Sequence, residues 1–428
     1  MHDIPKTEFT LSPSITTFCV LFLFLPLTIL MSGCSQRLAP ISIENLPAAP
    51  LPRRFLWVEV LGTPPAISSP DSIGLLFDDA ERLGVTDLLV QVYRAGDAWF
   101  KSSFANHGDL DRLGFDPLSL CIDQGRKRGI KVHAWINLLN LAENKNARIL
   151  SVVGKEVLLT DNLDVRVDRY SSEGRPPDDR SKFFSLGSPG LWLDPGNPSV
   201  VRYQFALISE LLNKYPNLDG IHLDYFRYPY LLPIRPSSGV PFGFDFGYGR
   251  TSKRLFEREI GESSAFVSDS KTGQKPSGAA ISRKWDQWRR SRLDKFIVDV
   301  NRNLNNDQEL TVAVLSWSDR AYLSSYQDWR GWLQKGLVDG VMPMAYTKDM
   351  DHFGYMIQQG AAFGGFRGQV YAGIGTWILD DLEIQEQIEK ALTSGAAGTA
   401  LFSYRNLKLR PKLPEVNGFA REGRSQLQ

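Results

Sequence analysis

The sequence predicts an α/β protein whose chain closes into a (β/α)8 barrel, and three features support this prediction. Short apolar runs alternate along the chain with amphipathic segments of helical period, as in a parallel sheet whose strands are joined by helices. There are eight such runs, the number of strands in a closed barrel of this class. No glycine-rich phosphate loop follows any of them, which makes a doubly wound open sheet the weaker alternative. The runs are FLWVEV (55–60), VTDLLVQVY (85–93), IKVHAWI (130–136), LDGIHLDY (218–225), LTVAVLSW (310–317), VDGVMPMAY (338–346), QVYAGIG (369–375) and AGTALFSY (397–404).

The predicted helices between these runs are marked by residues that start or stop helices. Asp116-Pro117 and Asn197-Pro198 each combine an N-cap side chain with a proline in the first turn. Glycines stand where helices are expected to end, because glycine adopts the left-handed conformation that often closes a helix. These stops are Gly84, Gly129, Gly336 and Gly395.

The predicted barrel spans residues 55–407 and is interrupted by two long polar stretches, at about 138–190 and 228–284. They follow the third and fourth strands, at the end of the barrel where loops build the active face. We therefore expect long insertions that form lids or cleft walls rather than separate domains. Residues 408–428 are polar and are predicted to be a C-terminal tail.

The N-terminal segment has the character of an export signal. Its apolar run FCVLFLFLPLTILMSGC (18–34) is too short and too poorly flanked for a stable membrane span. The end of this run, Met31-Ser32-Gly33-Cys34, resembles the bacterial lipoprotein box, in which the cysteine is lipidated. We expect residues 1–33 to be a signal peptide, Cys34 to carry a lipid that binds the membrane, and residues 34–54 to be a proline-rich tether. The protein is then expected to be lipid-anchored in the cell envelope. In a Gram-negative cell this location is the outer membrane or the periplasmic face, and a Gram-positive or cyanobacterial host would change it. A plain signal peptide or a single anchor helix is the alternative.

Composition argues against several other classes of function. The 428 residues include 49 basic and 48 acidic side chains, a net charge of +1, so no long-range field attracts nucleic acid. The five histidines include no pair with metal-binding spacing, so neither a metal site nor a cofactor is expected. No Gly-x-Ser-x-Gly motif occurs, and Cys121 lies on the apolar face of a predicted helix, which disfavours serine or cysteine nucleophiles.

The fourth predicted strand, in the segment DGIHLDYFRYP (219–229), carries the most informative side chain. Residues of a strand alternate between its two faces, so His222 and Asp224 point together toward the barrel axis. A buried carboxylate costs several kcal/mol unless it is paired or partly solvated. We therefore interpret Asp224 as a working residue, while the alternative is a carboxylate that Arg227 or His222 merely holds in place. Asp219 and Asp339 begin their strands at the opposite end and are assigned to loop capping.

The same alternation places polar or aromatic groups inward on other strands, close to their C-terminal ends. These inward sets are Trp57 and Glu59, Gln91 and Tyr93, His133 with Trp135 and Asn137, and Met342 with Met344 and Tyr346.

Aromatic side chains gather near the predicted strand ends. Aromatic rings that stack on sugar rings, beside carboxylates and amides that bond hydroxyls, hold polysaccharides in water. Core packing explains any single aromatic as well, so the clustering is what indicates a polysaccharide site. The aromatic residues are Trp99, Trp135, Trp192, Tyr225, Phe226, Tyr228, Trp317, Tyr346, Trp377 and Tyr404. The candidate substrate-binding residues among them are Trp135, Tyr225, Trp317, Tyr346, Trp377 and Tyr404, together with Arg227.

Six blocks of sequence, in order and at fitting spacing, resemble the glycosyl hydrolase-like 10 family of bacterial barrel proteins. This resemblance implies a (β/α)8 glycosidase fold and hydrolysis of cell-wall glycan strands from which the peptides have been removed. The blocks are QVYRAGDAWFKS (91–102), FDPLSLCIDQGRKRGIKVHAWIN (115–137), LDPGNPSVVRY (193–203), DGIHLDYFRYP (219–229), YQDWRGWLQKGLVDGVMPMAY (326–346) and a glycine-rich last strand.

The resemblance also implies which side chains line the cleft. Carried over position by position, they are Arg94, Asp97, His133, Asn137, His222 and Asp224. The chain departs from the family at Tyr93-Arg94-Ala95, where relatives commonly show Arg-Pro, so the contact from the second strand is expected to shift. The fourth strand is also similar to the signature of family 18 chitinases, but Phe226 stands where that signature has its acid. Substrate-assisted chemistry of the chitinase kind therefore lacks its proton donor.

Hydrolysis of a glycosidic bond ordinarily needs two carboxyl groups. Asp224 is predicted to be the nucleophile or the charge stabiliser. The candidates for the acid are Asp319, Asp349 and Glu59, and Asp319 ranks first because related barrel glycosidases carry the pair on strands four and five. The alternative function is a non-catalytic glycan-binding lipoprotein on the same fold, with Asp224 as a hydrogen-bond acceptor.

Overall fold

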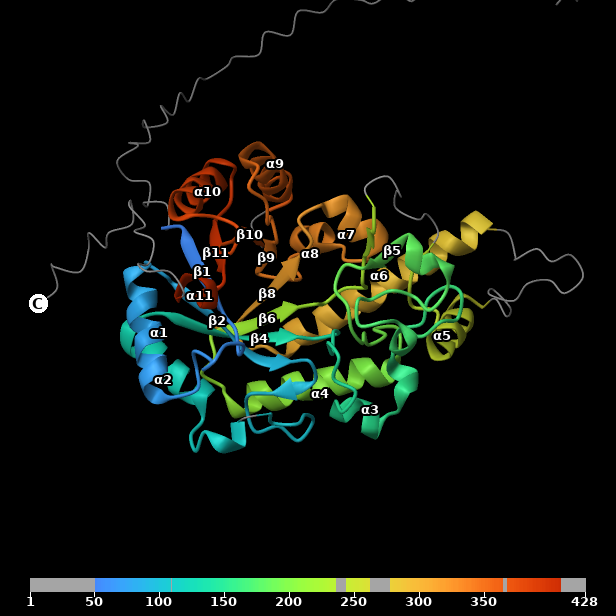
Figure 1. The fold of residues 1–428 in the computed structure, drawn as a ribbon, viewed down its shortest axis with the longest axis horizontal. Helices are drawn as coiled ribbons and strands as arrows, with labels where there is room; N and C mark the ends of the chain where they lie inside the picture. The colour runs from blue at the N-terminus through green and yellow to red at the C-terminus, as the bar shows by residue number, and fades with distance from the viewer. Residues whose placement is uncertain (1–50, 109, 236–243, 262–277, 365–367, 409–428) are drawn as a thin grey trace, which may run out of the picture. The chain divides into compact units, whose positions relative to one another are not determined.

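Parallel strands close into a barrel in the computed structural model (Figure 1). The structure describes residues 51–428 except 109, 236–243, 262–277, 365–367 and 409–428. Strand β1 pairs with both β2 and β11, so the sheet is closed and the predicted fold class is confirmed. The barrel strands are β1 (Arg53–Val58), β2 (Asp87–Arg94), β4 (Lys131–Asn137), β6 (Gly220–Asp224), β8 (Glu309–Val314), β9 (Gly340–Pro343), β10 (Gln369–Gly375) and β11 (Gly398–Phe402).

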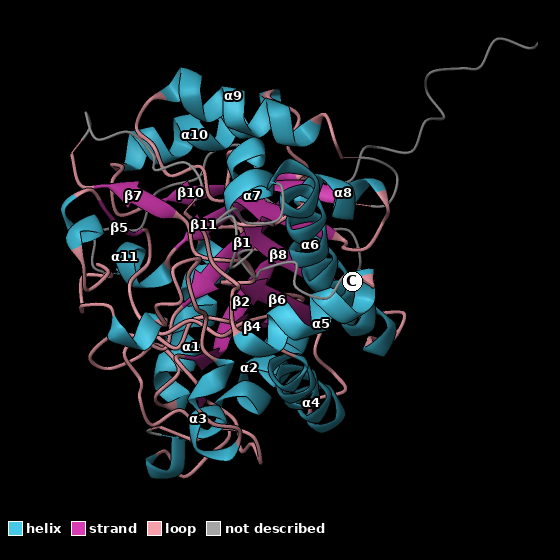
Figure 2. Cartoon of the chain, turned by 90° about the vertical axis from the view of Figure 1, so that its right-hand side faces the viewer, coloured by secondary structure: helices cyan, strands magenta, loops and turns pink. Residues whose placement is uncertain are grey.

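Helices surround the barrel and follow its strands in turn (Figures 1 and 2). The helices that return the chain from one strand to the next, with the one after β11, are α1 (Pro70–Arg82), α2 (Pro117–Arg128), α4 (Pro198–Lys214), α6 (Gly278–Asn303), α8 (Trp329–Gln334), α9 (Met350–Ala361), α10 (Asp381–Thr393) and α11 (Tyr404–Lys408). Shorter pieces within the connections are α3 (Arg148–Val152), α5 (Arg250–Ile260), α7 (Ser318–Ser324) and 3-10 turns at Leu110–Arg112, Lys155–Val157, Val167–Arg169 and Asp179–Lys182. Among the helices of the described ranges, none combines the length and the apolar character that a membrane span requires.

The predicted helix signals act as expected. The Asp116 side chain accepts from the backbone N–H of Ser119 at 3.1 Å and caps α2. Asn197 caps α4 in the same way, through the N–H of Ser199. Gly129 closes α2 with a φ of 66°, a left-handed conformation that favours glycine.

Two long insertions rise from the C-terminal end of the barrel, after β4 and after β6. The first contains β5 (Phe184–Leu186) and the second contains β7 (Leu231–Pro233). These two strands pair antiparallel, so the insertions are joined to each other beside the barrel (Figure 2). The prediction of cleft walls rather than separate domains agrees with this arrangement.

The barrel interior is filled by large side chains that small residues on neighbouring strands accommodate. Gly340 shows the constraint, because a Cβ at this position would lie 2.5 Å from the ring of Tyr371. A second and larger core lies between the strands and the helices. The interior cluster consists of Phe55, Trp57, Leu89, Trp135, Ala313, Met342, Tyr371 and Ala400.

Strand β2 contains a β-bulge that the sequence analysis did not foresee. Gln91 pairs with Trp135, but Tyr93 pairs with the next residue of β4, Ile136, so β2 contains one extra residue. The prediction that Tyr93 faces the axis is therefore wrong, because the bulge turns its ring into the outer core. The following residue, Arg94, turns toward the barrel mouth instead.

Several predicted segments lie outside the described residues. The signal peptide, Cys34 and most of the proline-rich tether fall within residues 1–50, and nearly all of the polar tail falls within 409–428.

Candidate active site

A pocket of about 510 Å³ lies at the C-terminal end of the barrel. Strand ends supply its floor, and residues of both insertions supply one side. The residues that line it are Trp57, Glu59, Leu61, Gln91, Arg94, Trp135, Asn137, Ser188, Asp224, Tyr225, Arg227, Tyr230, Leu232, Ala313, Leu315, Ser316, Trp317, Arg320, Met344, Tyr346, Trp377 and Phe402.

Asp224 is the last residue of β6 and lies on the pocket floor with 6% of its surface exposed. Its Oδ1 accepts a hydrogen bond of 2.6 Å from the backbone N–H of Tyr225, and its Oδ2 accepts one of 3.3 Å from Trp135 Nε1. The nearest guanidinium nitrogen is Nη1 of Arg227, 3.8 Å from Oδ1, which is too far for a hydrogen bond. Tyr225 has a φ of 52°, so the backbone turns sharply where the strand ends.

Burial raises the pKa of the Asp224 carboxyl above its usual value, and Arg227, the Tyr225 N–H and the Trp135 indole offset only part of this rise. A carboxyl group with a raised pKa keeps its proton to higher pH. That property suits a proton donor.

His222 lies one layer below Asp224 and supports the pocket floor without lining it. Its Nδ1 lies 2.9 Å from Thr311 Oγ1, and its Nε2 accepts a hydrogen bond of 3.1 Å from Trp57 Nε1. Burial lowers the pKa of His222 well below its usual value, and His133 lowers it further, so the imidazole stays neutral. The neutral ring fixes the indole of Trp57, which lines the pocket above it.

Glu59 follows β1 and is the other carboxyl group in the pocket lining among the described residues. Its Oε2 accepts a hydrogen bond from Ser403 Oγ, at the end of β11. Tyr346 also lines the pocket, and the charges of Asp224 and Glu59 both raise the pKa of its phenol. Burial raises the pKa of Tyr346 well above its usual value, and Asp224 raises it further, so its phenol stays neutral.

Aromatic rings form two sides of the pocket. Trp317 follows β8 and is 47% exposed, while Trp377 follows β10 and is 48% exposed. Trp377 contacts Tyr346 edge-on, with ring centroids 4.8 Å apart. Half-exposed indole rings beside carboxyl groups match the chemistry of sugar binding, because an apolar face and hydrogen-bonding groups lie close together.

Most of the predicted site residues come together in this pocket. Those outside its lining are His222, described above, and Asp319, Asp349, Tyr404, Asp97 and His133. Asp319 projects from α7 with 79% of its side chain exposed and pairs with Arg330 at 3.1 Å, because the chain enters a helix at Ser318 and turns the carboxylate to solvent. The expectation that it lies in the cleft is therefore wrong. Asp349, another candidate acid, caps α9 through the N–H of His352 and is likewise outside the lining.

Tyr404 and Asp97 are also placed elsewhere. Tyr404 begins α11, and its hydroxyl donates to Asp79 at 2.7 Å in the outer layer of the barrel. Asp97 forms the short hairpin of β3 (Asp97–Ala98) with β2 and accepts from Asn144 Nδ2 at 3.2 Å. Both residues leave the axis because the strand ends before them and the backbone turns.

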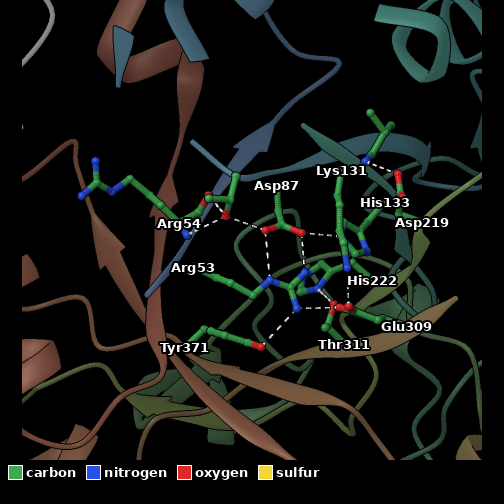
Figure 3. Close-up of polar contacts among 12 residues, drawn as sticks. Arg53, Arg54, Asp87, Lys131, His133, Asp219, His222, Glu309, Thr311 and Tyr371 are labelled. Carbon is green, nitrogen blue, oxygen red and sulfur yellow. Dashed lines mark hydrogen bonds and ion pairs between the residues drawn. The ribbon is translucent and has the colours of Figure 1, made fainter. Parts of the chain in front are cut away.

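His133 faces the axis as predicted, but it lies at the N-terminal end of the barrel. Its Nε2 lies 2.9 Å from Asp87 Oδ1 (Figure 3). Asp87 also binds Arg53, which reaches Glu309 at 2.8 Å. The expectation of a cleft position is wrong because alternation along a strand determines the face and not the depth of a side chain. Asp219 and Asp339 accept from the N–H groups of Val132 and Leu310 at this end, in agreement with their capping assignment.

The sequence analysis missed the residues that the insertions and α7 bring to the pocket. Ser188 comes from the first insertion, Tyr230 and Leu232 come from the second, and Arg320 comes from α7. The aromatic-rich end of DGIHLDYFRYP was the one available signal, because Tyr230 follows it directly. Among the described residues, no group of three histidine, cysteine, aspartate or glutamate side chains could hold a metal ion.

The chain is similar in sequence to two proteins named glycosyl hydrolases. Glycosyl hydrolase DigH of Escherichia coli (strain K12) is 26% identical over 333 residues, which cover 69% of this chain and 65% of that protein. Glycosyl hydrolase YngK of Bacillus subtilis (strain 168) is 21% identical over 295 residues, which cover 63% of this chain and 48% of that protein. The chain therefore spans less than two thirds of the length of these relatives.

The chain also resembles a solved structure and matches a family model. A chitinase from Bacteroides thetaiotaomicron is 10% identical, with a TM-score of 0.43 over 83% of this chain and 90% of that one, a likeness too weak to support a conclusion. A family model described as Glycosyl hydrolase-like 10 matches residues 71–365, which is more than half of the chain and includes β2 to β9. The chain belongs to the glycosyl hydrolase-like 10 family.

Proposed function

We propose that the protein is a glycoside hydrolase that cleaves a polysaccharide in the pocket at the C-terminal end of its barrel. The observation that carries this proposal is the pair Asp224 and Glu59, which are the two carboxyl groups of the described pocket lining. Glycoside hydrolysis needs such a pair, one group to protonate the leaving oxygen and one to act as nucleophile or to activate water. Family membership and the half-exposed tryptophans support the same reaction.

Asp224 is the proton donor in this mechanism and Glu59 is the ionised partner. The raised pKa of Asp224 supports the first role, whereas the sequence alone favoured Asp224 as the nucleophile or charge stabiliser. The proton of Asp224 passes to the glycosidic oxygen as the bond to the anomeric carbon breaks. Glu59 either forms a glycosyl ester, which a water deprotonated by Asp224 then hydrolyses, or takes a proton from the water that attacks the anomeric carbon. A carboxyl separation of about 5 Å produces the first course, and roughly 6.5–9.5 Å produces the second.

The substrate that we propose is the glycan strand of bacterial cell wall from which the peptides have been removed. The pocket combines indole faces with amide and carboxyl groups, as the binding of sugar rings requires. The two joined insertions form one side of the pocket, and this placement is compatible with a polymer that extends past the barrel mouth.

We also propose that the protein is lipid-anchored in the cell envelope through Cys34. The segment Met31-Ser32-Gly33-Cys34 after an apolar run supports this location, and residues 34–54 provide a proline-rich tether. Mass spectrometry of the membrane fraction tests it: a diacylated N-terminal peptide is expected from the parent chain and not from Cys34→Ala.

The test of the proposed activity is digestion of peptide-free cell-wall glycan by the parent protein and by Asp224→Asn. Release of soluble fragments by the parent and its loss in the variant are expected. Glycan binding without any fragment from the parent would instead favour the non-catalytic glycan-binding protein. An Asp224→Asn variant that digests as fast as the parent would exclude Asp224 as the acid.

A further inference from the structure

Arginine side chains form a distinct part of the pocket lining. Arg94, Arg227 and Arg320 lie around the same cavity as Glu59 and Asp224, so three guanidinium groups face two carboxyl groups. The pocket is thus positive by one charge when both carboxyl groups are ionised, and by two when Asp224 carries its proton. Neutral hydroxyl groups do not require such an excess of positive charge.

Arg227 is buried without matching acceptors. It is 3% exposed, and its Nε and Nη1 have no hydrogen-bond partner among the described residues. Asp224 lies within ion-pair range at 3.8 Å but beyond hydrogen-bond distance, and the guanidinium rests over the ring of Tyr225 at 4.9 Å. Buried donors of folded proteins nearly always have partners, because an unmade bond is costly. The missing acceptor therefore points to a ligand.

Arg94 and Arg320 approach from other sides of the pocket. The bulge in β2 directs Arg94 to the cavity, and it makes no side-chain hydrogen bond or ion pair with the described residues. Arg320 is held in position from α7, where it donates to the backbone oxygen of Leu231 at 2.7 Å and lies 4.8 Å from the ring of Tyr230. Its remaining donors are available to a ligand in the pocket.

We propose that this arginine cluster, Arg94, Arg227 and Arg320, binds an ionised carboxylate carried by the sugar. A guanidinium matches a carboxylate in charge and in its two-pronged shape, which a neutral sugar cannot reproduce. Removal of a peptide that is amide-linked to a sugar carboxyl leaves such a carboxylate. This inference rests on the proposed function, and it gives a physical reason for the peptide-free glycan that we propose: the amide of an attached peptide is neutral and bulky where the cluster needs a small anion.

The first experiment changes the ligand alone. Peptide-free cell-wall glycan is compared with the same glycan after its carboxylates have been converted to primary amides. We expect amidation to lower kcat/KM at least about tenfold, which corresponds to about 1.4 kcal/mol. Equal rates on the two glycans would overturn the inference.

The second experiment changes the protein and reads the ratio of the two rates. Arg94→Gln and Arg320→Gln should bring the ratio of free to amidated glycan toward one. A variant that only damages the fold lowers both rates and leaves the ratio unchanged, and that result in both variants would contradict the inference. Arg227→Lys tests the buried position with its charge retained, and a reduced but persistent preference is expected.

A matched control is available in α6. Arg290 lies 4.0 Å from the ring of Tyr322 and donates to the backbone oxygen of Tyr322 at 3.2 Å, so its surroundings resemble those of Arg320, but it does not line the pocket. Arg290→Gln should keep the preference of the parent. A loss of preference in this control equal to that in Arg320→Gln would contradict a local effect.

Binding measurements separate this inference from the proposed function. Calorimetry with Asp224→Asn measures affinity for the two glycans while cleavage is disabled. Preferred binding of the free carboxylate, with no cleavage by the parent, would support the arginine cluster and refute the hydrolase. Equal cleavage of both glycans would support the hydrolase and refute the arginine cluster. Absence of both binding and cleavage would refute the hydrolase and the arginine cluster together.

Discussion

The two ends of the barrel both carry charged side chains, but they differ in how those charges are matched. At the N-terminal end, Asp87 binds Arg53 and His133, and Glu309 binds Arg53 and Lys131, each within hydrogen-bond distance (Figure 3). At the C-terminal end, the Arg227 and Asp224 side chains stand 3.8 Å apart without a direct hydrogen bond. One end contains matched pairs, and the other contains groups that lack full partners.

This difference appears in the acidity of the two buried aspartates. Burial alone raises the pKa of either carboxyl group, but hydrogen bonds from His133 and Arg53 hold the pKa of Asp87 well below its usual range. At Asp224 the partners are too few or too distant, so its pKa stays raised. A buried acid with complete partners stabilises the fold, whereas one with incomplete partners remains able to give up a proton to a substrate.

The largest effect is expected from removal of the carboxyl groups at the C-terminal end. Glu59→Gln should lower kcat/KM on peptide-free glycan by about 10²–10⁴, the usual contribution of one acid or base group. Because the proposed mechanism has Glu59 and Asp224 act on the same bond, the double variant with Asp224→Asn should be little slower than either single variant. Initial rates of reducing-end release measure this, and multiplied losses would contradict a shared step.

Removal of a carboxyl group at the N-terminal end should affect stability instead of rate. Asp87→Asn leaves Arg53 and His133 without their shared partner, and the loss of one member of a buried pair costs about 3–5 kcal/mol. Urea unfolding measures the change in the free energy of unfolding. The kcat of the folded fraction should stay within twofold of the parent, and a catalytic loss without destabilisation would undermine the contrast between the two ends.

The contacts of Asp87 with Arg53 and His133 also predict how the stability of the protein depends on pH. The folded-state pKa of Asp87 is lowered, so its stabilising contribution is complete above about pH 4, near the unfolded pKa, and is lost as the pH falls toward the folded pKa. The parent should therefore lose more free energy of unfolding between pH 5 and pH 3 than Asp87→Asn does. Parallel pH dependence of the two proteins would show that other acids govern this range.

A smaller effect concerns the pH profile of catalysis. Arg227 lowers the pKa of Asp224, so Arg227→Gln should raise that pKa further and keep the acid protonated to higher pH. The basic limb of the kcat profile should move to higher pH in this variant. Arg227→Lys should return the basic limb toward its position in the parent. A shift of the basic limb to lower pH in Arg227→Gln would contradict the role of Asp224 as the proton donor.

The smallest effect is expected at Asp319, which lies on the surface. Asp319→Asn breaks only an exposed pair with Arg330, so the free energy of unfolding should change by less than about 0.5 kcal/mol. Glycan hydrolysis should match that of the parent. A large loss of activity would return Asp319 to the list of candidate acids.

The barrel itself could be predicted from the sequence because its signals are local and repeated. Apolar runs appear at strand spacing, and caps such as Asp116 and Asn197 mark the helices that follow. Asp224 could be predicted as well, because alternation within one regular strand is enough to orient it.

The pocket could be predicted only in part, because four of its determinants do not follow from alternation along a strand. Alternation fails at the bulge in β2, where one extra residue turns Tyr93 outward and brings Arg94 inward. It also carries no information on depth, which explains why His133 lies at the N-terminal end. Beyond a strand end the backbone turns, so Asp319 could not be oriented from the sequence. Contacts between segments that are far apart in the sequence, such as that of Tyr230 with Arg320, produce no periodic pattern.

The pairing of β5 with β7 limits which changes of length the two insertions can accept. The two strands belong to different insertions, yet they pair in register. The paired residues are Phe184 with Pro233, Ser185 with Leu232, and Leu186 with Leu231. An insertion or deletion in one of the two strands displaces its partner, so a change of length in one insertion requires a matching change in the other. Grafting experiments should therefore exchange the two insertions between relatives together, as one matched pair.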